Sequence, residues 1–188
     1  MCNDFGNHIP YDDYLRAFSE IRVPLRFPEA PPNLEPRDDI WPTDVAPTLR
    51  RREGGIELAQ LRWGFPPGRP KAAPVINFRS EGRKFPNGRC LVPASHFFEF
   101  TGTKSPKSKW KFTKAGENWF CLAGLSRPMP DGAGDAFTLL TTVPGPDVAQ
   151  STIVRWLFYW PHWLDLSRPE AELLRALPAG ALTVEQVR

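Results

Sequence analysis

The sequence has 188 residues, of which 41% are hydrophobic and 24% are charged, so it is long enough to fold as one domain around a sizeable core. Its formal net charge of +3 does not by itself indicate a nucleic-acid partner, and its three widely spaced cysteines exclude a disulfide framework and a zinc site of the Cys/His type. It contains neither a signal peptide nor an apolar run long enough to cross a membrane, so we expect a reduced cytoplasmic protein without a cofactor or metal.

In the first third of the chain, apolar residues predict one helix, one loop and one strand. Tyr11, Tyr14, Leu15 and Phe18 recur at helical spacing and predict a helix over residues 10–20. Residues 24–47 hold seven prolines and predict an extended loop. Alternation of apolar and polar residues then predicts a strand over residues 56–65.

The rest of the chain predicts further strands and one more helix. The strands are expected at residues 75–78, 90–92, 96–100, 110–113, 119–122 and 137–142. Ser167 and Glu170 form a capping-box pattern that predicts a short helix over residues 169–177. The sequence therefore predicts an α+β fold, with one β-rich domain over residues 1–188, a partly closed, barrel-like sheet and a few short helices.

Cys2 is the first candidate for a reactive group. Removal of Met1 would leave an α-amine, which titrates at about 7.7–8.0, beside a thiol that titrates at about 8.5. This 1,2-aminothiol can attack a carbonyl as an N-terminal nucleophile, or it can trap an aldehyde as a Schiff base that the thiol closes to a thiazolidine. By position alone, Cys2 can equally be an incidental second residue.

Glu99 is the candidate acid and base. It lies among Phe97, Phe98 and Phe100, and strand alternation places Phe98 and Phe100 on the face opposite Phe97 and Glu99. Desolvation in this apolar surrounding predicts a raised carboxyl pKa, which suits proton transfer. An exposed charge on an edge strand is the alternative interpretation.

A basic segment with interleaved aromatic residues is the candidate nucleic-acid contact. Its cations are Arg62, Arg69, Lys71, Arg79, Arg83, Lys84 and Arg89, and its aromatic residues are Trp63, Phe65, Phe78 and Phe85. Cations for phosphates and aromatic faces for bases are what single-strand binding needs. A solvated basic face above a packed aromatic core is the alternative. The basic stretch 101–109 is interpreted as a hairpin tip, and His8 and His96 as structural residues.

Several motifs occur in an order that resembles the SRAP family, the SOS-response-associated peptidases or abasic-site processing proteins. They are Met1-Cys2, Trp63-Gly64, Asn77-x-Arg79-x-Glu81, Arg89-Cys90-Leu91-Val92-Pro93-Ala94 with Phe97-Phe98-Glu99-Phe100, and Phe137-x-x-Leu140-Thr141-Thr142. The resemblance runs from residue 2 to about residue 148. Each motif is weak alone, but the ordered set with Cys at position 2 is specific.

The resemblance implies a function in DNA repair. Members bind single-stranded DNA at abasic sites, remove their own initiator Met and form a thiazolidine crosslink through the freed Cys, here Cys2. It implies a nucleoid-associated protein, which we expect to be a monomer. The implied catalytic residues are Cys2, Asn77, which orients the amine and the sugar, and Glu99, which shuttles protons.

The resemblance also implies DNA contacts at four positions. Arg79 corresponds to an arginine that grips a phosphate beside the lesion, and Trp63 to a stacking or wedge element for flanking bases. Thr142 corresponds to a hydroxyl that contacts the phosphate backbone, and Arg155 to the arginine of a His-x-Arg motif.

The chain departs from the family pattern at two places. Asn3-Asp4 stands where the family often has Gly-Arg, which removes a phosphate contact and adds a negative charge. If Arg155 is the motif arginine, Ile153 occupies the position of the catalytic His and cannot transfer a proton. A local change of reading frame around codons 149–161 would explain this loss. An N-terminal-nucleophile amidohydrolase and a non-catalytic single-stranded DNA-binding module are therefore kept as alternatives.

Overall fold

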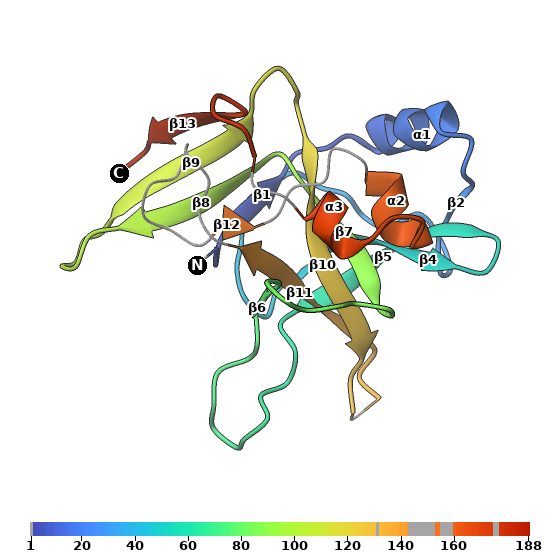
Figure 1. Cartoon of the computed structure of the whole chain (residues 1–188), viewed down its shortest axis with the longest axis horizontal. Helices are drawn as coiled ribbons and strands as arrows, with labels where there is room; N and C mark the ends of the chain where they lie inside the picture. Colours follow the sequence, from blue (N-terminus) through green and yellow to red (C-terminus); the bar gives the residue numbers. More distant parts are fainter. Residues whose placement is uncertain (1, 131, 143–152, 155–159, 175–176) are drawn as a thin grey trace.

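The protein consists of two β-sheets with short helices on one side. The computed structural model describes residues 2–130, 132–142, 153–154, 160–174 and 177–188. The smaller sheet has the strand order β13-β9-β8-β1-β3, formed by Leu182–Gln186, Ser108–Lys114, His96–Thr101, Phe5–Asn7 and Arg37–Ile40. In Figure 1 the β8–β9 hairpin and β13 project on the side away from the helices.

The larger sheet has the order β12-β11-β10-β7-β4-β5-β2. Its strands are Ile153–Val154, Asp135–Thr142, Phe120–Pro128, Arg89–Ala94, Val45–Arg52, Gly55–Trp63 and Leu25–Arg26. The additional strand β6 (Asn77–Arg79) pairs in parallel with β11. β11 also pairs in parallel with the end of β5, at Ala136↔Arg62 and Phe137↔Trp63, so the sheet partly closes on itself, as the sequence predicts.

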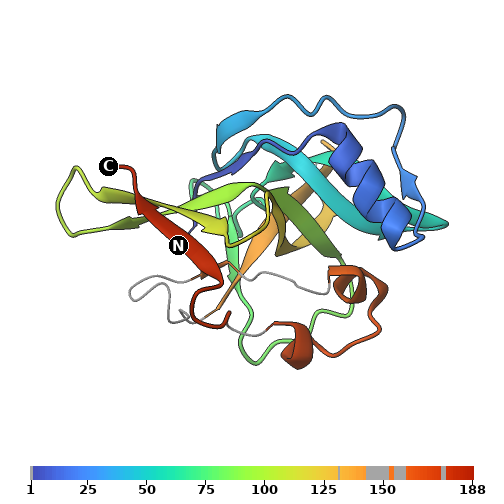
Figure 2. The ribbon, with the colours of Figure 1, turned by 90° about the horizontal axis from the view of Figure 1, so that it is seen from above.

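Two apolar clusters lie on the two faces of the larger sheet. One lies between the sheets and includes Phe5 and Phe97 from the smaller sheet with Trp63 and Phe137 from the larger sheet. Helices cover the second cluster: α1 (Tyr11–Glu20), α2 (Trp160–Asp165) and α3 (Glu170–Leu173). Neighbouring residues of one strand divide between the clusters, as Val92 and Leu91 of β7 do, because strand side chains alternate between faces. Figure 2 shows α1 and the α2–α3 segment flanking the larger sheet.

Most predicted strands and both predicted helices are confirmed, but the long loop is not. Within residues 24–47 the chain forms β2, β3 and the beginning of β4. Pro47 is tolerated in β4 because β7 pairs with β4 only at Leu49 and Arg50, so the missing N–H of Pro47 faces no strand partner on that side. β4, β13 and α2 were not predicted from the sequence.

The predicted capping box is wrong. Pro169 precedes α3 and no side chain caps this helix. Glu170 instead accepts hydrogen bonds at its Oε1 from the backbone N–H of Phe85 and from Nη2 of Arg89, each at 2.7 Å. A buried arginine competes for this carboxylate, and its charge-assisted bond is stronger than a bond to a neutral helix N–H.

Candidate functional site around Cys2

Cys2 lies just before β1, inside the cluster between the two sheets. Its side chain is fully buried, and its thiol donates a hydrogen bond to the backbone carbonyl of Asp4 with an Sγ–O distance of 3.5 Å. Burial raises the pKa of the Cys2 thiol far above its ordinary value, and the negative charge of Glu99 raises this pKa further. The thiol is therefore protonated at neutral pH in the chain that still carries Met1.

Asn77 fixes the backbone of Cys2. β6 runs beside β11 in the register Asn77↔Leu139, and the Nδ2 of Asn77 donates to the carbonyl oxygen of Cys2 at 2.7 Å. The Oδ1 of Asn77 is buried and accepts no hydrogen bond from the residues that the structure describes. A buried amide oxygen of this kind can accept a hydrogen bond from a group that enters the site.

Glu99 reaches the same core from β8. Its side chain is 2% exposed, so the alternative of an exposed charge on an edge strand is wrong. Phe97 stacks on Phe112 in the core, with ring centroids 4.8 Å apart, while Phe98 and Phe100 both face Lys109 on the other side of β8. The predicted alternation is thus confirmed.

Three of the predicted site residues are therefore brought together. Cys2, Asn77 and Glu99 come from the N-terminus, β6 and β8, and they are joined by one hydrogen bond and one electrostatic interaction. The site combines a thiol, a buried carboxylate and an amide. Such a set can position a carbonyl, move a proton and supply a nucleophile.

Trp63 does not form a stacking surface for bases. It is fully buried, its Nε1 donates to the carbonyl oxygen of Ile76 at 3.0 Å, and its ring packs between Phe5 and Phe137 at centroid distances of 5.1 and 6.2 Å. The predicted wedge role is therefore not supported. Trp63 closes β5 against β11 and so holds the sheet that carries Asn77.

The other predicted DNA contacts differ in exposure. The Arg79 side chain is 63% exposed and lies 3.8 Å from Glu81, measured from Nε to Oε2, so its guanidinium is accessible to a phosphate. Thr142 is buried at the end of β11, which does not support a direct contact of its hydroxyl with the phosphate backbone. Arg155 lies outside the described residues.

The basic segment only partly matches its predicted role. Six of its seven cations are exposed, but Arg89 is buried and its Nη2 pairs with Oε1 of Glu170 at 2.7 Å. Three of its four aromatic residues are buried, and Phe78 is half-buried. The segment therefore forms a basic surface above an aromatic core, and its three buried rings do not offer a surface on which bases could stack.

A buried ion-pair cluster beside Cys2 was missed. Lys109 of β9 bridges Asp4 and Asp39 at Nζ–Oδ distances of 2.7 and 2.8 Å, and its ammonium lies 3.7 Å from the ring centroid of Phe98. Burial raises the pKa of Asp4 to about 7, although the hydrogen bond from Lys109 acts in the opposite direction. No sequence signal links residues 4 and 109, because they are distant in the chain.

His8 and His96 are both held by Asp38. Nε2 of His8 lies 2.8 Å from Oδ1 of Asp38, and Nε2 of His96 lies 2.9 Å from its backbone oxygen. Burial lowers the pKa of His96, so this ring is neutral at pH 7. These contacts agree with the structural interpretation of the two histidines.

Ile153, which occupies the expected histidine position if Arg155 is the motif arginine, pairs with the end of β11. β12 pairs with β11 in the register Thr142↔Ile153, and β6 pairs with β11 up to Thr141↔Arg79. The backbone at residue 153 and the strand that carries Asn77 and Arg79 thus both pair with the C-terminal half of β11.

The described residues contain neither a metal-binding cluster nor a membrane-spanning helix. No three His, Cys, Asp or Glu side chains in the described part of the chain gather closely enough to hold a metal ion. None of the helices in that part is long and apolar enough to cross a membrane.

The chain is similar to known proteins over its whole length. Two structures from Bordetella bronchiseptica, the second described as a phage-related protein, are 23% and 24% identical to this chain, with TM-scores of 0.70 and 0.74. Both comparisons cover all of this chain, together with 100% of the first structure's chain and 94% of the second's. A protein from Bacteroides thetaiotaomicron is 17% identical, with a TM-score of 0.66, over 81% of this chain and 78% of that one. These likenesses show the fold.

A search of curated proteins gave no match. The family model described as "SOS response associated peptidase (SRAP)" matches residues 1–188. The match covers every segment that contributes to the site around Cys2, and it agrees with the order of motifs in the sequence. The chain therefore belongs to the SRAP family.

Proposed function

We propose that this protein senses abasic sites in single-stranded DNA and crosslinks to them covalently through Cys2. The observation that carries the proposal is the convergence of Cys2, Asn77 and Glu99 from three distant segments, with Asn77 bound to the backbone of Cys2 at 2.7 Å. Membership of the SRAP family supports the same chemistry.

The first step removes Met1. Hydrolysis of the Met1–Cys2 peptide bond consumes one water, releases methionine and frees the α-amine of Cys2. We assign this step to the protein itself, as a thiol autopeptidase, with the Cys2 thiol as nucleophile and Glu99 as proton acceptor. A buried thiol of raised pKa needs such an acceptor, because the thiolate rather than the thiol is nucleophilic.

The second step joins the protein to the lesion. The α-amine of Cys2 attacks the aldehyde carbon of the ring-opened sugar, and loss of one water gives a Schiff base. The thiol then adds to the same carbon and closes a five-membered thiazolidine, with no oxidation or reduction. Glu99 supplies and removes the protons, Asn77 holds Cys2 in place, and Arg79 binds the adjacent phosphate. Arg155 stays a predicted phosphate contact.

Denaturing electrophoresis with an abasic single-stranded oligonucleotide tests the proposal. Wild type is expected to give a shifted band, Cys2→Ala none, and Glu99→Gln a band that forms about 10²–10⁴-fold more slowly, the usual contribution of one acid–base group. Cys121→Ala is the matched control, because Cys121 is also buried and unpaired but lies in the other apolar cluster.

Three results would contradict the proposal. Equal bands in all four proteins would exclude Cys2 as the attachment point. Mass spectrometry showing Met1 still attached would exclude the ring. Turnover of an amide substrate that does not depend on DNA would instead indicate an N-terminal-nucleophile amidohydrolase.

Ile153 favours a second candidate, a single-stranded DNA-binding module with impaired catalysis. Its backbone lies beside Thr142, where the family pattern places a histidine. We expect Ile153→His to speed crosslinking by about 10²–10⁴-fold, because it restores a proton-transfer group. An unchanged rate would show that the missing histidine does not limit the reaction. Reading the gene across codons 149–161 decides whether a change of reading frame caused the loss.

A further inference from the structure

An arginine-lined pocket lies beside the second apolar cluster, from which Phe78, Leu125 and Leu164 contribute to its lining. Its volume is about 710 Å³, and its walls come from β4, the segment before β6, β6 itself, the β10–β11 hairpin and α2. Asn77 and Phe78 are neighbours in β6, and strand alternation sends Asn77 to Cys2 and Phe78 into the pocket. The two sites are therefore separated by the thickness of one strand.

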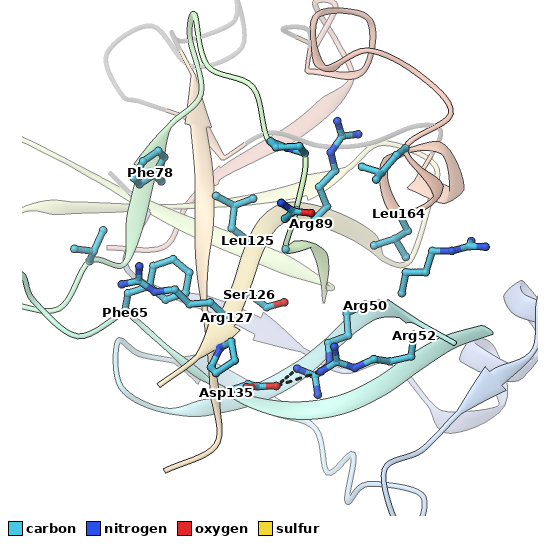
Figure 3. A pocket seen from close by; sticks show the side chains of 17 residues that line it. Arg50, Arg52, Phe65, Phe78, Arg89, Leu125, Ser126, Arg127, Asp135 and Leu164 are labelled. Carbon is cyan, nitrogen blue, oxygen red and sulfur yellow. Dashed lines mark hydrogen bonds and ion pairs between the residues drawn. The ribbon is translucent and has the colours of Figure 1, made fainter. Parts of the chain in front are cut away.

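The charge of the pocket is positive. Five arginines line it, namely Arg50, Arg51, Arg52, Arg89 and Arg127. Among the described residues, Asp135 is the one acidic residue in the lining. In Figure 3 the labelled arginines approach from three strands, namely Arg50 and Arg52 from β4, Arg89 from β7 and Arg127 from β10, and dashed lines connect Asp135 with the β4 arginines. An anionic ligand is the class that such a lining attracts.

Two of these arginines are structural. Arg50 binds Glu57, with an Nε–Oε2 distance of 2.5 Å, and also binds Asp135, and its side chain is only 12% exposed. Arg89 is buried, pairs with Glu170 and lies over the ring of Trp163. Their charges are already balanced, so they shape the pocket rather than hold a ligand.

The exposed arginines are placed for binding. Arg51 and Arg127 are exposed, and neither forms an ion pair within the described part of the chain. The Arg127 guanidinium lies over the ring of Phe65, with its Cζ 4.1 Å from the ring centroid. A guanidinium over an aromatic ring leaves its other side open to a nucleobase, and Arg51 can bind the phosphate that follows.

Two exposed cations lie on β6 or just after it, and β6 contributes residues to both sites. Arg79 is exposed at the end of β6, and the Cζ of Arg83 lies 4.6 Å from the centroid of the Phe78 ring, which lines the pocket. Arg127 and Arg51 line the same pocket. An acidic peptide also carries negative charges but offers no bases to stack on the Arg127–Phe65 pair, so a nucleic-acid strand fits this lining better.

We infer that this pocket binds a second segment of the crosslinked single strand, with a base on the Arg127–Phe65 pair and a phosphate on Arg51. The strand crosses β6 between the two sites. This inference rests on the proposed function, and it supplies the stacking surface that the buried Trp63 does not provide.

Fluorescence anisotropy with an undamaged single strand of about 16 nucleotides, the upper site size of single-strand binding folds, tests the inference. The slope of log affinity against log salt is expected to fall in magnitude by about 0.7 in Arg51→Ala, which loses one phosphate contact. Arg127→Ala is expected to lower the affinity about 5- to 150-fold at fixed salt, because it loses a base-stacking contact. Measuring both single variants keeps the test valid if one of them misfolds.

Arg16→Ala is the matched control, because Arg16 is 68% exposed on α1, away from the pocket, and its slope should equal that of wild type. A salt slope of Arg51→Ala equal to that of Arg16→Ala, or an affinity of Arg127→Ala equal to that of Arg16→Ala, would overturn the inference. So would displacement of the oligonucleotide by poly-glutamate at the same concentration as by unlabelled strand, which would assign the pocket to acidic peptides. Crosslinking by wild type, measured separately, reports on the proposed function alone.

Discussion

The Asp4–Lys109–Asp39 cluster makes a sharp prediction about stability and pH. Lys109 is the cation between a fully buried carboxylate and a second carboxylate, and both lie beside the segment that carries Cys2. Lys109→Met keeps the length of the side chain but removes its charge. Asp4 is then left buried without a cation, and the loss of one partner of a buried ion pair typically costs about 3–5 kcal/mol of unfolding free energy.

The loss of unfolding free energy in Lys109→Met should depend on pH. In wild type the folded-state pKa of Asp4 is about 7, above the ordinary 3.8, so its contribution to stability is largest in acid and declines until the pH passes about 7. Without Lys109 the pKa of Asp4 rises further, so the unfolding free energy continues to decline above pH 7, by up to about 1.4 kcal/mol per pH unit. We expect Lys109→Met to cost about 1 kcal/mol at pH 6, mainly through the lost cation–π contact with Phe98, and about 3–5 kcal/mol at pH 9.

Urea unfolding followed by circular dichroism at pH 6 and pH 9 measures both values. The double variant Asp4→Asn/Lys109→Met should lose the pH dependence of this cost, because residue 4 can then no longer ionise. Lys111→Met, on the same strand, is the matched control and should cost little at either pH. A cost of Lys109→Met that is equal at the two pH values, or equal to that of the double variant at pH 9, would refute the reasoning.

Two further substitutions test the packing around the site. Trp63→Phe removes one of the two hydrogen bonds that the carbonyl of Ile76 accepts, since the backbone N–H of Leu139 donates the other, and it should lower the unfolding free energy by about 0.5–1.5 kcal/mol in urea titrations. It should not change affinity for undamaged single-stranded DNA, whereas loss of a base-stacking ring would cost about 1–3 kcal/mol of binding. Gly6→Ala would place its Cβ 2.2 Å from two ring atoms of His96 and should cost about 1–3 kcal/mol of unfolding free energy. Gly68→Ala, with nothing within 4 Å of the new Cβ, is the control, and an equal effect of the two would contradict the steric argument.

The strands that alternate most regularly could be predicted from the sequence. The segment from Gly55 to Trp63 forms β5, and its buried residues largely follow a two-residue repeat. The segment from His96 to Thr101 forms β8, whose first four residues are buried on both sides of the strand. β4 could not be predicted in this way. Its Pro47 argues against a strand, and its apolar and charged residues do not alternate over its whole length, so only its partners β5 and β7 define it.

A site residue could be predicted only where its type and its immediate sequence neighbours already indicate a chemical role. Cys2 stands out by its position, and Glu99 by its phenylalanine neighbours, and both lie in the core of the site. Trp63 was predicted to bind bases because aromatic residues beside cations suggest it, but the same aromatic residue also suits a core. Burial decides between the two interpretations, and burial depends on the neighbouring strands.

The sequence by itself determined the family, the β-rich class and the pairing of an N-terminal thiol with one enclosed acid, because these depend on residue types and local periodicity. Only the tertiary structure decided that Arg89 is buried against Glu170, that Lys109 neutralises Asp4, and that the pocket lies behind β6. Ion pairs and pockets join residues that are far apart in the chain, and no local pattern records which distant side chain will supply the opposite charge.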